Sequence, residues 1–251
     1  MKISAVVLAG GGVEKSLSER FQVNSKGLIP LGGKLMILPV LEALRKSPSI
    51  EWISVSAPGG ELPPEAELLA DVVAPSGDDI LDSLINGIEA LNEKPEWVLA
   101  APCDAPFLTA EAIEDFLERC WKREADLCYS FVSREDSQRA YPDLSHTYVR
   151  LREGVFCGGS LILIRPGILE KAVKLVRDIL SARKAPWRLA AILGFSIVWK
   201  FSQGALSIAD LEERAFQLLG SRAAGIQVPD PSVAFNVDSA AQLDQAEKIL
   251  G

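Results

Sequence analysis

Histidine and paired cysteines, which mark many enzyme classes, are nearly missing from this sequence. Among its 251 residues there is one histidine, His146. A single imidazole excludes zinc sites built on several histidines, paired-histidine metalloprotease helices and histidine dyads. The four cysteines include no C-x-x-C pair. In a chain of this length, unpaired cysteines indicate reduced thiols, which are typical of cytoplasmic proteins. We therefore expect a cytoplasmic protein.

Long apolar segments are missing as well. The apolar stretch from Ala5 to Ala9 is too short for a signal peptide. The longest nearly apolar run, Leu189 to Trp199, contains Gly194 and Ser196 and is too short to cross a bilayer. We expect this run, with Trp187 just before it, to belong to the core or to a contact between subunits.

Positive charge is scarce relative to negative charge. The sequence contains 26 Lys and Arg residues and 34 Asp and Glu residues, which gives a net charge of −8 and a pI near 4.9. Such a balance argues against a nucleic-acid partner or a membrane partner that is recognised through bulk charge. Any chemistry must use carboxylates, Lys or Arg and backbone N–H groups, with or without a hard metal ion.

Apolar runs of strand type alternate with segments of helical periodicity through the first half of the chain. The expected strands are Ile3–Ala9, Trp52–Ala57, Asp71–Ala74 and Trp97–Ala101. Helical segments follow Gly32-Gly33, Gly77 and Thr109, the last of which is a typical N-cap. This alternation predicts a three-layer α/β/α fold with a mostly parallel, doubly wound sheet.

The pattern changes after about residue 125. Three strands joined by charged or glycine-containing loops predict a small inserted β portion, at Leu127–Val132, Thr147–Leu151 and Leu161–Arg165. Helices are expected at Pro166–Ala182, Trp187–Leu193 and Ile208–Leu219, followed by a last strand at Val233–Val237 and a helix at Ser239–Leu250. Because no Pro- or Ser-rich linker interrupts the chain, we expect one domain over residues 1–251.

Glycines and lysines follow the first expected strand. Leu8-Ala9-Gly10-Gly11-Gly12 leads through a polar loop to Lys26. Glycines let the backbone approach a polyphosphate so that N–H groups become ligands, and lysines supply positive charge. The segment matches neither the Walker A motif nor the dinucleotide G-x-G-x-x-G fingerprint. Taken alone, three glycines favour a tight turn between the strand and the loop.

Carboxylates follow two other expected strands. Asp104 lies between Pro102 and Pro106, a position that fixes its carboxylate at the strand end, where ligands of open parallel sheets bind. Asn236 and Asp238 offer further oxygen ligands for a cation such as Mg²⁺. The alternatives are a turn-forming role for Asp104 and helix capping for Asp238.

Together these segments resemble a known family. Leu8–Gly12, Lys26–Lys34, Pro102–Thr109 and Asn236–Leu243 are similar, in the same order, to the motifs of MobA-like nucleotidyltransferases. The resemblance implies the nucleotide-diphospho-sugar transferase fold. It also implies transfer of an NMP group from an NTP to a small phosphorylated acceptor, such as a molybdopterin, sugar phosphate or alcohol phosphate, with release of pyrophosphate and Mg²⁺ as cofactor.

The resemblance also assigns roles to residues. Lys26 and Asp104 are the expected catalytic residues, and the Mg²⁺ ligands are expected to be Asp104, Asp238 and Asn236. The expected nucleotide-binding residues are Leu8, Ala9, Gly10, Gly11, Gly12, Lys15, Lys26, Gly77 and Ser83. Phe156–Ser160 is similar to a glycine loop that precedes a late strand and faces the acceptor. The protein is expected to act as a monomer or homodimer.

The sequence departs from the family pattern at two positions. Val13 stands at the family's second glycine and Lys15 at its arginine. Valine cannot adopt the positive φ that glycine allows. Lysine keeps the positive charge but cannot form the two parallel hydrogen bonds of arginine to a phosphate. Two alternative functions therefore stay open. One is a glycosyltransferase of related architecture that uses a nucleotide sugar, although Asp104 supplies only half of the usual D-x-D. The other is a nucleotide-binding regulatory module without turnover.

Overall fold

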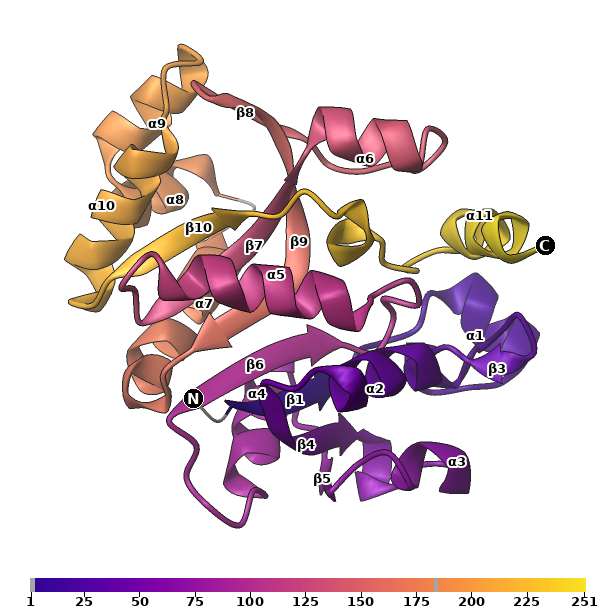
Figure 1. The fold of residues 1–251 in the computed structure, drawn as a ribbon. Coiled ribbons are helices and arrows are strands. Elements are labelled where there is room, and N and C mark those ends of the chain that lie inside the picture. The colour runs from indigo at the N-terminus through magenta and orange to yellow at the C-terminus, as the bar shows by residue number, and fades with distance from the viewer. Residues whose placement is uncertain (1–2, 183–184) are drawn as a thin grey trace.

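Strand β1 (Ile3–Leu8), a run of apolar residues, lies near the middle of an eight-stranded sheet and is buried over most of its length (Figure 1). The computed structural model describes residues 3–182 and 185–251. The sheet order is β10-β7-β9-β6-β1-β4-β5, with β8 added beside β9. The other bounds are β4 Ile50–Ala57, β5 Val72–Pro75, β6 Trp97–Pro102, β7 Leu127–Ser133, β8 Val149–Leu151, β9 Gly154–Ile164 and β10 Ala223–Gln227.

The sheet is mostly parallel, as the strand–helix alternation predicts. Strands β4, β1 and β6 run parallel to one another and β5 runs parallel to β4, whereas β9 is antiparallel to β6 and β7. The strands expected as a small inserted portion join this main sheet, in which β9 pairs with β6 and β7 pairs with the other edge of β9. A separate hairpin pairs β2 (Pro30–Leu31) with β3 (Lys34–Leu35).

Helices cover both faces of the sheet and complete the three layers. Helices α2 (Ile37–Lys46) and α5 (Ala110–Trp121) pack on one face, in a core that contains Leu41 and Phe116. Helices α4, α7 and α10 contribute to a core on the other face. The remaining helices are α1 Lys15–Phe21, α3 Pro64–Glu67, α4 Ile80–Glu89, α6 Arg134–Ala140, α7 Leu169–Ala182, α8 Pro186–Leu193, α9 Phe195–Ser202, α10 Ile208–Leu219 and α11 Ala240–Leu250.

A third apolar cluster joins the two ends of the chain. Leu17 of α1, Met36 before α2 and Leu243 of α11 pack with Phe235 and Val237, and all five are buried. The cluster places α1 and α11 side by side, beyond the carboxyl ends of the central strands (Figure 1). It therefore brings the first and last motifs of the sequence to the same end of the sheet.

Three local predictions are wrong. Val233–Val237 is not a strand, because a 3-10 turn at Pro231–Ala234 opens the segment, and β10 is the last strand. Phe156–Ser160 is not a loop before a strand but lies within β9. The polar loop between Gly12 and Lys26 contains a short helix, α1.

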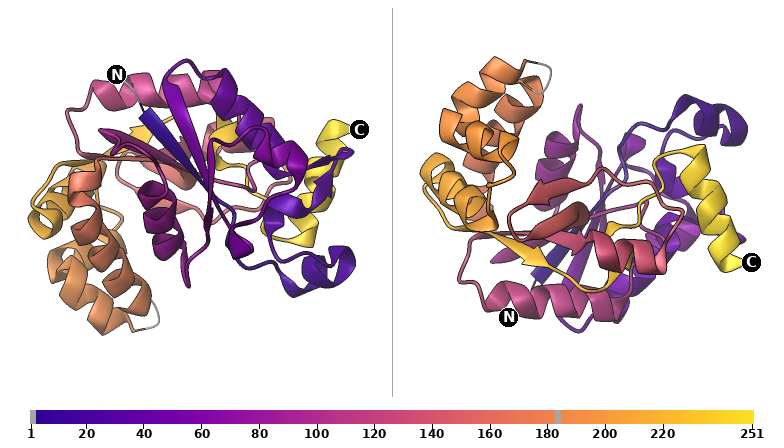
Figure 2. Two further views of the ribbon diagram at one scale, coloured as in Figure 1. Left: turned by 90° about the horizontal axis from the view of Figure 1, so that it is seen from below. Right: turned by 90° about the horizontal axis from the view of Figure 1, so that it is seen from above.

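Helices α7 to α10 form a lobe at one side of the sheet, away from α1 and α11 (Figure 2). We call residues 169–219 the helical lobe. Among the described residues, no helix is both long and apolar enough to cross a membrane.

Candidate active site

The carboxyl ends of β1 and β6 meet, because the two strands are parallel and Leu8 pairs with Pro102 in their register. The residues that follow these strands enclose a small cavity of about 80 Å³. The N-terminus of α4 also opens on it through Ile80 and Ser83, and a helix N-terminus favours negatively charged groups. The cavity is lined by Leu8, Gly10, Gly11, Lys26, Ile80, Ser83, Pro102, Cys103 and Asp104.

Lys26 joins two carboxylates from distant parts of the sequence. Its Nζ lies 2.7 Å from Oδ2 of Asp104 and forms a second ion pair with Oδ1 of Asp238. We call Lys26, Asp104 and Asp238 the site triad. The triad carries one positive and two negative charges, so its net charge is negative while all three groups are ionised.

Burial differs sharply within the triad. The side chains of Lys26 and Asp104 are 17% and 8% exposed, whereas that of Asp238 is 60% exposed. Burial opposes the charge of Lys26, but the attraction and hydrogen bonds of Asp104 and Asp238 outweigh it and raise the pKa of Lys26 above its usual range. Burial raises the pKa of Asp104, which Lys26 partly offsets. Lys26 is therefore a permanent cation at neutral pH.

Short contacts between loops hold the triad in place. Ser25 Oγ donates to the carbonyl of Ala9 at 2.6 Å, which fixes the Lys26 turn beside the glycine loop. The Val237 N–H donates to the carbonyl of Asp104 at 2.9 Å and so joins the last motif to the β6 loop. At Gly27 a Cβ atom would lie 3.0 Å from Ile37 Cβ and 3.1 Å from Cys103 Cβ, a tight contact that the neighbours would have to relieve by shifting.

The glycine loop has one packed and two open positions. A Cβ on Gly10 would collide with Ser76, but Gly11 and Gly12 face free space. Ser83 accepts a hydrogen bond from the Gly77 N–H at 3.0 Å. Ser83 is buried and lines the cavity, whereas Gly77 is not among the lining residues and is joined to the site through this hydrogen bond.

Two predicted site residues are turned elsewhere. The side chain of Lys15 is 88% exposed on α1 and pairs with Glu19 at 3.7 Å, so it does not line the cavity. Asn236 Oδ1 lies 3.0 Å from Ser160 Oγ of β9 and not against the triad. Ser160 and Val237 belong to segments that the resemblance names, but the sequence does not predict the contacts they make here. Ser25, a chain neighbour of Lys26, is not predicted at all.

The two carboxylates suit a hard divalent cation. Asp104 Oδ1 is buried and has no hydrogen-bond partner among the described residues. Mg²⁺ binds proteins through one or two carboxylates and takes its other ligands from water and phosphate oxygens. Within the described ranges no cluster of three or more His, Cys, Asp or Glu residues could form a closed metal cage. The donor set therefore fits Mg²⁺ shared with a phosphorylated ligand.

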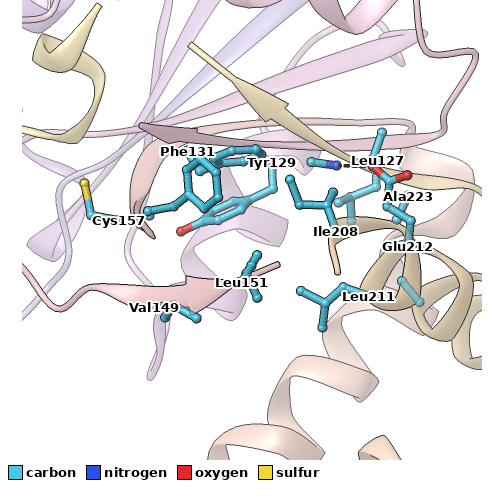
Figure 3. Close-up of a pocket in the computed structure, with 15 residues that line it drawn as sticks. Leu127, Tyr129, Phe131, Val149, Leu151, Cys157, Ile208, Leu211, Glu212 and Ala223 are labelled. Atoms are coloured by element: carbon cyan, nitrogen blue, oxygen red, sulfur yellow. Dashed lines mark hydrogen bonds between the residues drawn. The ribbon is translucent and has the colours of Figure 1, made fainter. Parts of the chain in front are cut away.

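A larger, apolar cavity of about 380 Å³ lies over the other half of the sheet (Figure 3). Tyr129 and Phe131 of β7 form one wall, and Leu151 of β8 and Leu211 of α10 face them. Its carboxylate, Glu212, accepts a hydrogen bond from the Gly225 N–H at 2.9 Å and is paired with Arg123. The cavity thus offers apolar surface and no free charge among its lining residues.

Comparison with known proteins identifies relatives over most of the chain. Residues 5–185 match the family described as the MobA-like NTP transferase domain. Molybdenum cofactor guanylyltransferases of Yersinia pestis and Yersinia pseudotuberculosis are 29% identical over 155 residues, which cover 60% of this chain and 70% of theirs.

Solved structures agree with the fold. A hypothetical transferase from Thermus thermophilus is 35% identical and superposes with a TM-score of 0.84, covering 97% of this chain and all of that one. A 2-C-methyl-D-erythritol 4-phosphate cytidylyltransferase, also from Thermus thermophilus, is 16% identical, with a TM-score of 0.55 over 100% of this chain and 99% of that one. The second likeness concerns the fold alone.

Proposed function

The chain belongs to the MobA-like NTP transferase family and is a nucleotidyltransferase, and we propose that it transfers an NMP group from an NTP to a small phosphorylated acceptor in a Mg²⁺-dependent reaction. The observation that carries this proposal is the site triad, in which Lys26 contacts both Asp104 and Asp238 beside the glycine loop. In the reaction an oxygen of the acceptor phosphate forms a bond to the α-phosphorus. The bond between the α-phosphorus and its bridging oxygen breaks, and pyrophosphate leaves.

This transfer needs positioning and charge more than proton chemistry. The attacking phosphate oxygen is already an anion, so no general base is required. The triad accordingly contains no histidine, and the raised pKa of Lys26 keeps that residue from acting as a base near neutral pH. Catalysis then depends on fixed positive charge near the α-phosphoryl group.

The chain's own residues divide these tasks. The open N–H groups of Gly11 and Gly12 hold the phosphates of the nucleotide. Lys26 stabilises negative charge that develops on the α-phosphoryl group. Asp104 and Asp238 hold Mg²⁺, which when bound neutralises charge on the phosphate oxygens of donor and acceptor.

The apolar cavity bears on the choice of acceptor. Strand β9 is the direct neighbour of β6, which leads to Asp104, and the same strand lines the cavity through Cys157 and Gly158. We propose that an acceptor whose phosphate binds at the triad extends along β9 toward this wall. The apolar lining favours an alcohol phosphate with a carbon-rich skeleton over a sugar phosphate, whose hydroxyl groups would lose hydrogen bonds to water there.

A pyrophosphate-release assay across the four NTPs, with Mg²⁺ and a panel of phosphorylated acceptors, tests the proposal. We expect Asp104→Asn to lower turnover by about a hundredfold or more, because the variant loses a metal ligand of the charged site. Asp178→Asn, which changes an exposed carboxylate of α7, is the matched control and should keep full activity. Thermal denaturation verifies that both variants fold.

Two other outcomes would overturn the proposal. Nucleotide binding without pyrophosphate release in every combination would indicate the regulatory module. Sugar transfer from a nucleotide sugar, with nucleoside diphosphate as the product, would indicate the glycosyltransferase.

A further inference from the structure

The charge of the chain is strongly divided between the first part of the helical lobe and the rest. Residues 169–204, which include α7, α8 and α9, contain seven Lys or Arg and two Asp or Glu, a net charge of +5. The remaining residues contain 19 Lys or Arg and 32 Asp or Glu, a net charge of −13. The chain as a whole is acidic, but residues 169–204 are basic. The charge of the molecule is therefore distributed very unevenly between this segment and the remaining residues.

Helices α8 and α9 are apolar but largely uncovered. Trp187 and Phe195 are 73% and 75% exposed, and Trp199 and Phe201 are more than half exposed. Among residues 185–204 whose burial is described, Ile197 is the one buried side chain. Of the two alternatives expected for this segment, the core is therefore wrong, and a contact between subunits stays a prediction. The rings of Phe195 and Trp199 are stacked, with centroids 6.3 Å apart, and exposed aromatic surface of this kind marks an interaction site.

Several lobe cations have no acidic partner. Arg177 pairs with Asp79 and Asp82, and Lys200 pairs with Asp210. Within the described part of the lobe, no ion pair involves Lys171, Lys174 or Arg188. The guanidinium of Arg188 lies 5.8 Å from the ring centroid of Trp187. An exposed tryptophan beside the unpaired Arg188, with further unpaired lysines on α7, matches the composition of helices that lie at a membrane surface.

We propose that α8 and α9 dock the protein on a membrane surface that contains anionic lipids. The aromatic rings enter the boundary between headgroups and acyl chains, and the Lys and Arg side chains contact lipid phosphates. The acidic remainder of the chain is repelled by the same surface, so the molecule is oriented with its lobe toward the membrane. This departs from the sequence-based expectation of no membrane partner, which considered only the summed charge.

A second copy of the chain is a poorer occupant of this surface. In a two-fold dimer the same patch meets itself, so an interface through α8 and α9, which contain Arg188 and Lys200 and no Asp or Glu, would bring like charges together. An anionic bilayer instead compensates that charge. The helices lie on the surface without crossing it, since each has only eight residues.

Vesicle flotation of the full chain tests the proposal. We expect binding to vesicles of phosphatidylcholine with phosphatidylglycerol, little binding to phosphatidylcholine alone, and weaker binding as salt increases. The double variant Trp187→Ala/Trp199→Ala should lower the partition coefficient by about tenfold or more, because two inserted rings are lost. Trp52→Ala removes an exposed tryptophan of β4 and should leave binding unchanged.

A charge variant and the oligomeric state complete the experiment. Arg188→Glu reverses an exposed charge with no ion pair and should reduce binding to anionic vesicles, with an unchanged melting temperature. The proposal is overturned if the wild-type chain binds neither vesicle type, or binds both equally. It is also overturned if light scattering shows a dimer that Trp187→Ala/Trp199→Ala dissociates while vesicle binding is absent. None of these outcomes depends on the nucleotidyl transfer proposed above.

Discussion

Gly10 and Gly11 are adjacent in the chain but meet opposite surroundings. A Cβ on Gly10 would collide with Ser76 and lie 3.2 Å from Ser83 Oγ, whereas a Cβ on Gly11 would meet nothing within 4 Å. Glycine at position 10 is therefore required by the fold itself. At position 11 the folded protein has room for a larger side chain. If glycine is needed at that position, the reason must be a ligand that approaches the backbone closely.

This contrast gives a paired prediction. Gly10→Ala should lower the melting temperature, because the loop must shift to relieve the collision with Ser76. Gly11→Ala should leave the melting temperature unchanged but weaken NTP binding, because a methyl group then separates the backbone from the phosphates. Thermal denaturation and nucleotide titration measure the two effects separately. Unchanged NTP affinity in Gly11→Ala would show that the loop does not contact the phosphates closely.

At the scale of single elements, local signals explain which predictions succeeded. Helix α10 has the predicted bounds, Ile208–Leu219, and its capping box of Ser207 and Asp210 is present in the structure. Strand β10 was missed because its sequence, Ala-Ala-Gly-Ile-Gln, lacks the β-branched run typical of a strand. The predicted strand at Val233–Val237 is wrong because its apolar residues are buried by packing against other side chains, and, among the described residues, the segment forms no hydrogen-bonded pairing with another strand. The ring of Phe235 contacts Phe107 and Tyr141, with centroids 4.7 Å and 4.8 Å apart.

The α10 capping box carries a pH-dependent prediction. The hydrogen bond from Lys200 and those from Ser207 lower the pKa of Asp210 to about 2, below its ordinary value of 3.8. A lowered pKa in the folded state means that Asp210 stabilises the fold above pH 3.8 and that this contribution disappears as the pH falls toward 2. Wild-type protein should therefore be more stable than Asp210→Asn near neutral pH, and the difference should shrink on acidification. Urea denaturation of both proteins at several pH values measures it, and a difference that does not change with pH would contradict the assignment.

At the scale of the whole molecule, the site depends on contacts that no local pattern contains. The order of strands predicts that the segments after β1 and β6 meet, and Lys26 and Asp104 do lie together. The convergence of Asp238 on the same lysine depends on the apolar cluster that joins α1 and α11, which links positions 212 residues apart. The orientation of Lys15 away from the cavity was not predictable, because it follows from α1, a helix hidden in a polar stretch.

The position of Asp238 should therefore respond to packing far from the triad. Leu243 of α11 is buried with Phe235 and Val237, and the Val237 N–H is bonded to the Asp104 carbonyl. Leu243→Ala should cost about 2–5 kcal/mol of stability, as buried leucine deletions do. It should also raise the Mg²⁺ concentration that gives half-maximal activity, because the backbone that carries Asp238 is no longer held firmly.

Leu219→Ala is the matched control for this prediction. Leu219 is also buried, but it lies at the end of α10, in the separate apolar cluster on the sheet face that α4, α7 and α10 cover. Its loss should lower stability by a similar amount and leave the Mg²⁺ requirement unchanged. Comparing the two variants separates a general loss of stability from a displaced ligand. Equal Mg²⁺ requirements in both would show that Asp238 is positioned by its local turn alone, and that the terminal helix contributes stability without shaping the site.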